Sequence, residues 1–210
     1  MAKTARSSKR SSGWRNMQDS DGFVREAVRL GIRSRSYFKI QEIDLRFNLF
    51  SLNQTVLDLG ASPGGWCQYA VSRIGSGGKV YAVDVLEMKP LDQVHFIRSN
   101  IIEQHFHKNL LPAIGNQKID LILSDMAPNL TGISSVDSRN FSDLYEAIFE
   151  VCGLVLAKGG ALVFKFFQDQ NSVNLKRECE SRFGTCAVFK PKASRSRSQE
   201  SYMIANRYSL

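Results

Sequence analysis

The sequence lacks the features that mark membrane, metal-binding and disulfide-rich proteins. No apolar run approaches the roughly 20 residues of a transmembrane helix, so we expect no membrane partner. The four cysteines show no Cys-x-x-Cys spacing, which favours free thiols in a reducing, cytoplasmic compartment over a zinc site or a disulfide framework. His105 and His107, near Glu103, are interpreted as part of a solvated loop, and we expect no metal site.

Residues 1–20 lack any acidic residue before Asp19 and also lack the apolar core of a secretory signal. They have too few apolar residues for the amphipathic face of a mitochondrial presequence. We predict a flexible basic arm that contacts phosphates, and the alternative is a tail that only aids solubility. The basic residues of this arm are Lys3, Arg6, Lys9, Arg10 and Arg15.

The composition describes a globular chain with an excess of positive charge. Hydrophobic residues make up 43% and charged residues 23% of the 210 positions, which allows one domain of ordinary size with a proper core. Lys and Arg number 28 against 20 Asp and Glu, a formal charge of +8 that favours a polyanionic partner. We predict a monomer with one domain at 21–210, comprising a helical segment at 21–50 and an α/β core at 51–210.

Short β-forming runs alternate with stretches of helical periodicity, a pattern typical of an α/β fold. Strands are predicted at 55–59, 79–84, 94–97, 119–124, 161–167, 185–189 and 202–206, and helices at 66–74, 140–157 and 172–183. Gly159 and Gly160 are expected to end the helix at 140–157. Two more helices are predicted within 21–50, the first ending at Gly31 and the second capped by Ser34.

Residues 56–66, with the sequence VLDLGASPGGW, predict a binding site. The apolar run predicts a buried strand, and the glycines and Pro63 predict a tight turn into a helix. Glycine lets a ligand approach the backbone closely, and a helix N-terminus offers unpaired N–H groups to an anionic group. We interpret the stretch as a nucleotide-type pocket at the carboxyl end of a strand; a tight turn without a ligand is the alternative.

The spacing of the glycines indicates which nucleotide this turn binds. Gly60 is followed by Gly64 and Gly65, so the middle glycine of the dinucleotide fingerprint Gly-x-Gly-x-x-Gly is missing. Asp84 ends the next apolar run, where a carboxylate can accept both hydroxyls of an adenosine ribose. The combination suits an adenosine ligand without a pyrophosphate, such as S-adenosylmethionine, and argues against a dinucleotide-dependent oxidoreductase.

Two charged residues occupy positions in or at the end of apolar strands. Asp125 follows the apolar run at 119–124, so it is expected at the carboxyl edge of the sheet, where ligands bind in such folds. Lys165 lies inside the apolar run at 161–167, and burial of an unpaired ammonium is unfavourable. We interpret Lys165 as paired with a carboxylate or catalytic; the alternative is a lysine that reaches solvent at the strand end.

Five ordered motifs resemble the FtsJ (heat-shock) family of bacterial ribosomal RNA large-subunit 2′-O-methyltransferases. They run nearly from end to end of the chain. They are residues 30–39 (LGIRSRSYFK), the glycine-rich stretch, residues 124–129 (SDMAPN), the strand with Lys165, and residues 194–202 (SRSRSQESY). The resemblance implies a Rossmann-like methyltransferase fold with a seven-stranded, mostly parallel sheet, an antiparallel last strand and helices on both faces.

The resemblance also implies a catalytic tetrad of Lys39, Asp125, Lys165 and Glu200. By itself Lys39 would be interpreted as a surface lysine at the edge of a helical stripe. We expect Lys165, held between Asp125 and Glu200, to position a ribose hydroxyl and accept its proton. The implied methyl donor is S-adenosylmethionine, and the implied substrate is a uridine ribose in 23S ribosomal RNA within the large subunit.

Family analogy places Gly64, Trp66, Asp84 and Asp125 at the cofactor, together with Gly60 and Gly65 of the same turn. One position departs from the family pattern. Asn100 stands where an aspartate usually accepts a hydrogen bond from the adenine amino group, and an amide oxygen can still accept it without the charge.

Three alternatives to this function are weighed against the sequence. A base N-methyltransferase would carry an Asn/Asp-Pro-Pro-aromatic turn in place of residues 125–128 (DMAP). A non-catalytic RNA-binding assembly factor would have no need of the complete tetrad. The same tetrad also serves enzymes that act on tRNA and mRNA caps, and the basic segments at 29–39 and 190–197 indicate a polyanion without specifying which RNA.

Overall fold

The computed structural model describes residues 22–209 except 104, 129–130, 168–171 and 196–197. The predicted basic arm at 1–20, Asn129 of the SDMAPN motif and part of the basic segment at 190–197 lie outside the described residues. Two helices, α2 (Gly22–Arg29) and α3 (Ser36–Phe47), precede the sheet, as the sequence predicts. No helix in the described part of the chain is long and apolar enough to span a bilayer.

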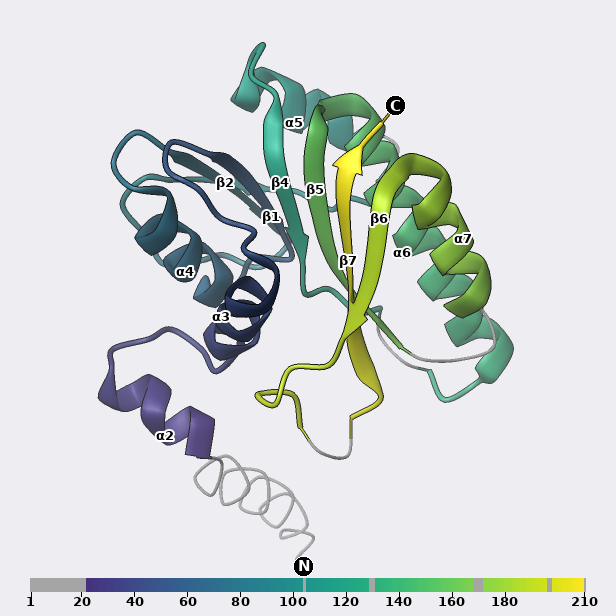
Figure 1. Cartoon of the computed structure of the whole chain (residues 1–210), viewed down its shortest axis with the longest axis horizontal. Helices are drawn as coiled ribbons and strands as arrows, with labels where there is room; N and C mark the ends of the chain where they lie inside the picture. Colours follow the sequence, from purple (N-terminus) through teal and green to yellow (C-terminus); the bar gives the residue numbers. More distant parts are fainter. Residues whose placement is uncertain (1–21, 104, 129–130, 168–171, 196–197, 210) are drawn as a thin grey trace, which may run out of the picture.

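A seven-stranded sheet with the order β3-β2-β1-β4-β5-β7-β6 forms the centre of the molecule (Figure 1). Strands β1 to β5 pair in parallel, whereas β7 is antiparallel to both its neighbours, so the predicted fold class is confirmed. The strands are β1 (Thr55–Leu59), β2 (Lys79–Asp84), β3 (Val94–Arg98), β4 (Ile119–Ser124), β5 (Leu156–Phe167), β6 (Phe183–Phe189) and β7 (Glu200–Tyr208).

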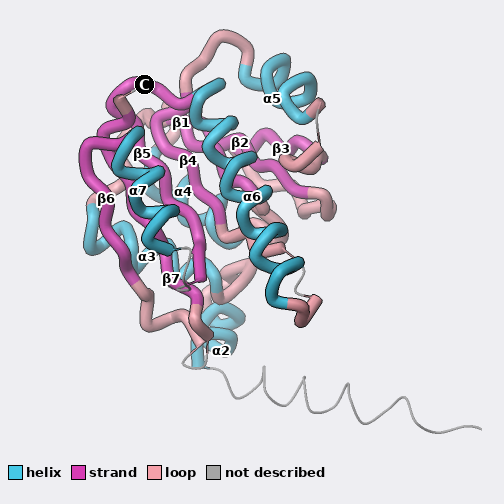
Figure 2. Tube along the Cα trace, turned by 90° about the vertical axis from the view of Figure 1, so that its right-hand side faces the viewer, coloured by secondary structure: helices cyan, strands magenta, loops and turns pink. Residues whose placement is uncertain are grey.

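Helices cover both faces of this sheet (Figure 2). One face carries α3 and α4 (Gly65–Ile74), whose apolar side chains join a single buried cluster with the sheet. The other face carries α5 (Phe106–Ile114), α6 (Ser134–Val155) and α7 (Ser172–Arg182). The basic helical segment and the long helix α6 therefore lie on opposite faces.

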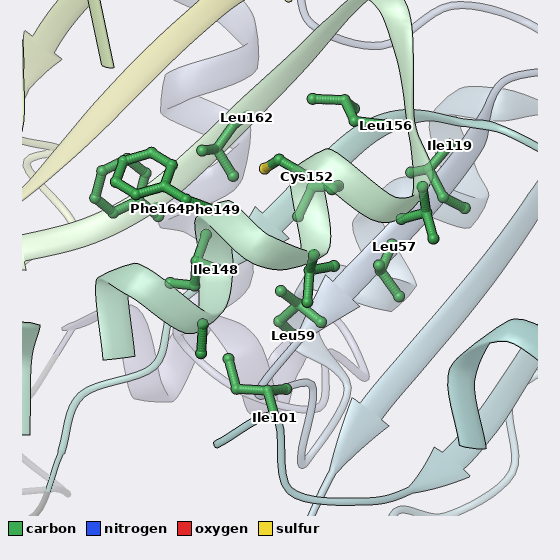
Figure 3. Close-up of a cluster of buried hydrophobic side chains, with 14 of the residues drawn as sticks. Leu57, Leu59, Ile101, Ile119, Ile148, Phe149, Cys152, Leu156, Leu162 and Phe164 are labelled. Atoms are coloured by element: carbon green, nitrogen blue, oxygen red, sulfur yellow. The ribbon is translucent and has the colours of Figure 1, made fainter. Parts of the chain in front are cut away.

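Alternate residues of the central strands feed the two cores. Leu57 and Leu59 of β1 point into the cluster under α6, where they meet Ile148 and Cys152 (Figure 3). Val56 of the same strand joins the cluster under α3 and α4. Strands buried on both faces read as continuous apolar runs, which is why β1, β2 and β4 are recognisable from sequence.

Helix α5 was not predicted, and the interpretation of His105 and His107 as a solvated loop is wrong. His107 lies within α5 and His105 is its N-cap residue. The buried side chains Phe106, Leu110 and Ile114 recur every four residues, but Pro112 near the end of the short helix weakens the sequence signal. Among the described residues, no group of His, Cys, Asp or Glu side chains is arranged to hold a metal ion.

Three predicted boundaries are also wrong. Helix α6 ends at Val155, and β5 begins at once, so Gly159 and Gly160 do not end the helix. They lie in a bulge of β5, where Gly159 has a φ of 84°. Helix α6 starts at Ser134 and not at 140, and the sequence did not indicate this start because the polar first turns of the helix lack an apolar stripe. Ser34 does not cap α3: its N-cap residue is Arg35, with no side-chain hydrogen bond.

Candidate active site

The register of the sheet brings the predicted reactive residues together at its carboxyl edge. Ser124, the last residue of β4, pairs with Phe164 of β5, which sets Asp125 beside Lys165. Lys165 in turn lies opposite Tyr202 of β7. These side chains therefore come from three adjacent strands, at the edge where open α/β sheets bind ligands.

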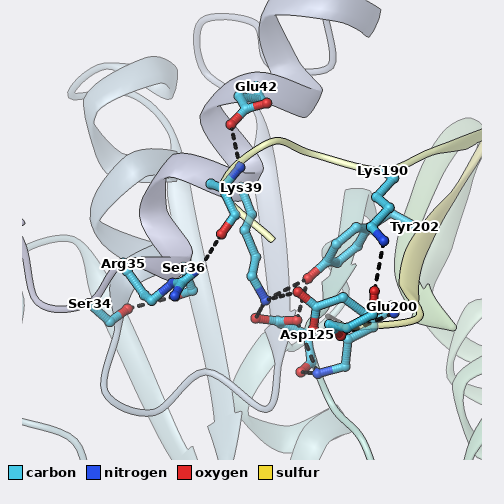
Figure 4. A network of polar contacts seen from close by, with 12 residues as sticks. Ser34, Arg35, Ser36, Lys39, Glu42, Asp125, Lys190, Glu200 and Tyr202 are labelled. Atoms are coloured by element: carbon cyan, nitrogen blue, oxygen red, sulfur yellow. Dashed lines mark hydrogen bonds and ion pairs between the residues drawn. The ribbon is translucent and has the colours of Figure 1, made fainter. Parts of the chain in front are cut away.

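A continuous chain of ion pairs links the four predicted tetrad residues, and Figure 4 labels three of them, Lys39, Asp125 and Glu200. Lys39 Nζ lies 3.0 Å from Glu200 Oε1 and 3.5 Å from Asp125 Oδ2. Lys165 Nζ lies 3.2 Å from Asp125 Oδ1 and donates a hydrogen bond of 2.5 Å to the Asp125 main-chain carbonyl. Lys39 is only 8% exposed, in contrast to the surface lysine that helical periodicity alone indicates.

The order of the groups differs from the expected one. Among the described residues, Glu200 forms its ion pair with Lys39. Lys165 therefore does not lie between Asp125 and Glu200. In the register of β5 and β7, Glu200 stands opposite Phe167, two residues beyond Lys165. The order is therefore Glu200, Lys39, Asp125, Lys165.

Tyr202 is a fifth member of the network that sequence reasoning missed. Its hydroxyl donates to Asp125 Oδ1 at 2.6 Å and accepts from Lys39 Nζ at 3.1 Å. Burial, and the negative charges of Asp125 and Glu200, raise the pKa of Tyr202 well above its ordinary value, so the hydroxyl stays protonated. The available signal was strand periodicity, which puts Tyr202 on the same face of β7 as Glu200.

Asp125 keeps its negative charge in this setting. Burial by itself raises the pKa of its carboxyl, but the positive charges of Lys165 and Lys39 and the hydrogen bond from Tyr202 outweigh that effect. The net result is that the pKa of Asp125 lies below its ordinary value. A carboxylate that remains ionised can hold both lysines in place.

A pocket of about 650 Å³ opens at the carboxyl ends of β1, β2 and β3. It brings together three of the predicted cofactor residues, Gly60, Asp84 and Asn100. The carboxylate of Asp84 is oriented by main-chain N–H groups, with Ser62 donating to Oδ2 and Leu86 donating to Oδ1, each at 2.8 Å. Its remaining lone pairs are available to a ligand. The other lining residues are Val83, Val85, Leu86, Ser99, Ile101, Ile102, Met126, Ala127, Pro128, Asn140, Asp143 and Leu144.

Comparison with known proteins identifies the family. Residues 32–208 match the model of the FtsJ-like methyltransferase family. The chain belongs to this family. It is therefore a methyltransferase, and its fold and the resemblance of its motifs agree with that assignment.

Two solved structures resemble this FtsJ-like methyltransferase. One is a Plasmodium falciparum protein titled as a candidate ribosomal RNA methyltransferase; it is 27% identical, with a TM-score of 0.74, and the match covers 84% of this chain and 98% of that chain. The other is a Clostridium thermocellum protein titled as a candidate rRNA methylase. At 12% identity and a TM-score of 0.51, covering 80% of this chain and 96% of that chain, it shows a shared fold alone.

The glycines of the FtsJ-like turn lie close to protein side chains, and their expected contact with a ligand stays a prediction. A Cβ at Gly60 would lie 2.2 Å from Cγ of Met126, and one at Gly64 would lie 2.7 Å from Sδ of Met88. A Cβ at Gly65 would lie 2.2 Å from Oγ of Ser34. The turn thus packs α4 tightly against its surroundings.

Gly64, Gly65 and Trp66 do not line the pocket that contains Asp84. Trp66 is 3% exposed and donates its indole N–H to the Ser36 carbonyl at 2.8 Å, which ties α4 to α3. Its ring centroid lies 5.7 Å from that of Tyr202. Trp66 therefore lies between the glycine turn and the polar network, and the cofactor contact of these three residues stays a prediction.

Asp58 is a second residue that sequence reasoning missed. It is 1% exposed in the middle of β1, and Sγ of Cys67 donates to its Oδ2 at 3.0 Å. The pKa of Asp58 is raised to about 7 as the net result of burial, which raises it most, the hydrogen bond from Cys67, which lowers it, and the charges of Asp125 and Asp84, which raise it. The sequence signal was present, since Asp58 is an acid within an apolar strand, as Lys165 is a base within one.

Proposed function

We propose that this FtsJ-like methyltransferase transfers the methyl group of S-adenosylmethionine to the 2′-hydroxyl of a uridine ribose in large-subunit (23S-type) ribosomal RNA. The observation that carries the proposal is the network of Lys39, Asp125, Lys165 and Glu200 beside the pocket of Asp84. A ribose hydroxyl needs both positioning and removal of one proton, and this network can supply both.

The residues of the pocket fit the adenosine part of the cofactor. Ile101, Met126 and Pro128 supply apolar surface for a purine ring, and Asp84 supplies acceptors for the two ribose hydroxyls. Asn100 Oδ1 accepts the Ile102 N–H at 3.2 Å and retains a second lone pair for an amino group. When bound, S-adenosylmethionine supplies a methyl group on a cationic sulfur, which is a good leaving group.

Lys165 has the contacts that a general base requires. The deprotonated form of Lys165, which is the form that can act as a base, has two N–H donors and one lone pair, and Asp125 offers two acceptors, its Oδ1 at 3.2 Å and its carbonyl at 2.5 Å. With both donors engaged, the lone pair of Nζ is free to accept the proton of a ribose hydroxyl. The ammonium that results is then stabilised by the adjacent Asp125 carboxylate.

Lys39, Glu200 and Tyr202 position this base. Glu200 and Asp125 neutralise the charge of Lys39 at 3.0 and 3.5 Å, and Lys39 in turn fixes the Oδ2 side of Asp125. Tyr202 fixes the Oδ1 side with a hydrogen bond of 2.6 Å. Asp125 is thereby held from both sides, so that its orientation toward Lys165 does not depend on the substrate.

Ribosomal RNA is the RNA class that the comparisons favour. The Plasmodium falciparum relative is titled as a ribosomal RNA methyltransferase candidate, and the net charge of +8 of this chain suits any RNA. We further propose that the enzyme acts as a monomer in the cytoplasm, on the assembled large subunit late in its maturation. The rival functions are methylation of tRNA or another RNA, and RNA binding without catalysis.

The test is incubation of the protein with methyl-labelled cofactor and four acceptors: undermethylated large subunits, naked large-subunit rRNA, small-subunit rRNA and tRNA. After nuclease digestion, we expect the label in a 2′-O-methyluridine and chiefly from large subunits. Label in a base-methylated nucleoside would overturn the reaction, and label chiefly in tRNA would overturn the substrate. RNA binding without transfer would favour the assembly factor.

A further inference from the structure

The loop between β6 and β7 is fastened to α3 through its main chain. Glu42 accepts two main-chain N–H groups with its two oxygens, that of Lys192 at 2.7 Å and that of Ala193 at 2.8 Å. Arg35, two turns earlier on the N-terminal side of α3, donates to the Ala193 carbonyl. The donor and the acceptor of Ala193 are therefore both bound by side chains of the same helical segment.

The side chain of Ala193 is a third point of attachment. It is 0% exposed and packs in a small apolar cluster with Ala27 of α2 and Phe38 of α3. Partly buried side chains that pack against this cluster are Phe23, Ile32 and Tyr37. Because its methyl group is fully buried in this cluster, Ala193 anchors the loop between α2 and α3.

The loop also holds its own shape. The Ser194 N–H donates to the Pro191 carbonyl at 3.0 Å, and Lys190 Nζ donates to the Ser198 carbonyl at 2.7 Å across the loop. Two basic side chains, Lys192 and Arg195, remain exposed on this fixed backbone. Without attachment, a loop with this density of positive charge would be expected to stay extended through self-repulsion.

We propose that Glu42 is a positioning residue that fixes this loop as a phosphate-binding wall for the RNA substrate, on which Lys192 and Arg195 contact the RNA backbone. The inference rests on the proposed function for the identity of the polyanion. Glu42 lies one helical turn after Lys39, so the same helix sets the distance between the wall and the reactive network.

The fixed loop gives the acidic residue Glu42 a role beside the exposed basic side chains Lys192 and Arg195. Glu42 weakens the attraction of this surface for RNA through its charge, yet it satisfies two main-chain donors and orders the loop before binding. An ordered loop loses less conformational entropy when the RNA binds, which strengthens binding at a fixed set of contacts. Simple charge counting predicts that removal of Glu42 improves RNA binding, whereas the positioning role predicts the reverse.

The test measures the affinity of the full-length protein for an unmodified large-subunit rRNA transcript at several salt concentrations. We expect Glu42→Ala to weaken binding about tenfold and Glu42→Gln, which keeps one acceptor oxygen, to weaken it by less. In the wild-type background, the double substitution Lys192→Ala and Arg195→Ala should make the negative slope of log K against log salt shallower by about 2, roughly one for each lost phosphate contact. In the Glu42→Ala background, the same double substitution should change this slope by less than half as much, because the loop is no longer held in place.

Glu150→Gln on α6 is the matched control, since it removes an exposed carboxylate on the opposite face of the sheet. Cofactor affinity and thermal unfolding of each variant separate a local effect on the loop from a folding defect. Unchanged or tighter RNA binding by Glu42→Ala, in a protein that methylates RNA, would overturn the inference and leave the proposed function standing. RNA binding that depends on Glu42, in a protein that transfers no methyl group, would support the inference and overturn the proposed function.

Discussion

The two halves of the carboxyl edge of the sheet hold their charges in different ways. Around β4, β5 and β7, Lys39, Asp125 and Lys165 neutralise one another through contacts of 3.5 Å or less. Around β2, the carboxylate of Asp84 is held by main-chain N–H groups of the turns that follow β1 and β2. A substitution in the first half therefore disturbs several side chains, whereas one in the second half stays local.

The largest combined effect on methyl transfer and stability is expected from Asp125→Asn, which breaks the half built on side-chain charges. The amide leaves Lys39 and Lys165 with one carboxylate fewer in a largely buried site. We expect methyl transfer to fall by at least about a hundredfold, and the free energy of unfolding to fall by about 3 kcal/mol or more. Transfer kinetics and chemical denaturation measure the two losses. Near-normal transfer and stability would show that the lysines do not depend on this carboxylate.

Asp58→Asn examines the boundary between the halves, because the charges of both Asp125 and Asp84 act on Asp58. The pKa of Asp58 is raised to about 7 in the folded protein, so between pH 4 and 7 the folded state binds more protons than the unfolded state. The stability of the cofactor-free wild type should therefore decline as pH rises through this window.

In the Asp58→Asn variant that decline should flatten, with a difference of up to about 4 kcal/mol between the ends of the window. Chemical denaturation at pH 4, 5.5 and 7 measures it. Cys67→Ala serves as a control, since it removes the thiol donor and keeps the carboxyl group. Parallel pH profiles of wild type and Asp58→Asn would contradict the raised pKa of Asp58.

Asp84→Asn breaks the other half and should leave the network intact. The amide keeps one acceptor oxygen but loses the charge, and hydrogen bonds to charged groups contribute about 1.5–3 kcal/mol. We expect the cofactor to bind about 10- to 100-fold more weakly, with little change in transfer rate at saturating cofactor. Titration calorimetry and saturation kinetics measure these quantities. A fall in the saturated rate larger than the fall in affinity would mean that the halves are coupled.

The smallest effect is expected from Tyr202→Phe. Two hydrogen bonds are lost, one to Asp125 and one from Lys39, but Lys39 keeps its two carboxylate partners. Hydrogen bonds of this kind contribute about 1 kcal/mol each, so transfer should fall by up to about thirtyfold without a change in cofactor affinity. Complete loss of transfer in this variant would assign Tyr202 a direct part in the reaction.

The sequence predicted the elements that local patterns define. The strands β1, β2 and β4 have the predicted bounds because both their faces are buried, and the motifs at strand ends correctly brought Asp125 and Lys165 together. The short helix α5 and the polar start of α6 were missed because neither presents a long apolar stripe.

The contacts that sequence could not supply depend on register and packing. Glu200 stands opposite Phe167, two residues beyond Lys165, and pairs with Lys39, which is a detail of strand register and packing that periodicity does not specify. The hydrogen bonds by which Glu42 attaches the loop between β6 and β7 join residues that are remote in the chain, and no local sequence motif predicts them. The glycines of the turn were recognised, but the side chains that fill the space beside them were not.

The most direct test of the division between the two halves is to measure cofactor affinity and methyl transfer on the same preparation of Lys165→Ala. Lys165 contacts Asp125 in the reaction half and does not line the pocket of Asp84. We predict that methyl transfer to RNA is abolished while the cofactor binds within about threefold of the wild-type affinity, since only the proposed proton acceptor is removed. Near-normal turnover, or a loss of cofactor binding as large as the loss of transfer, would contradict this account.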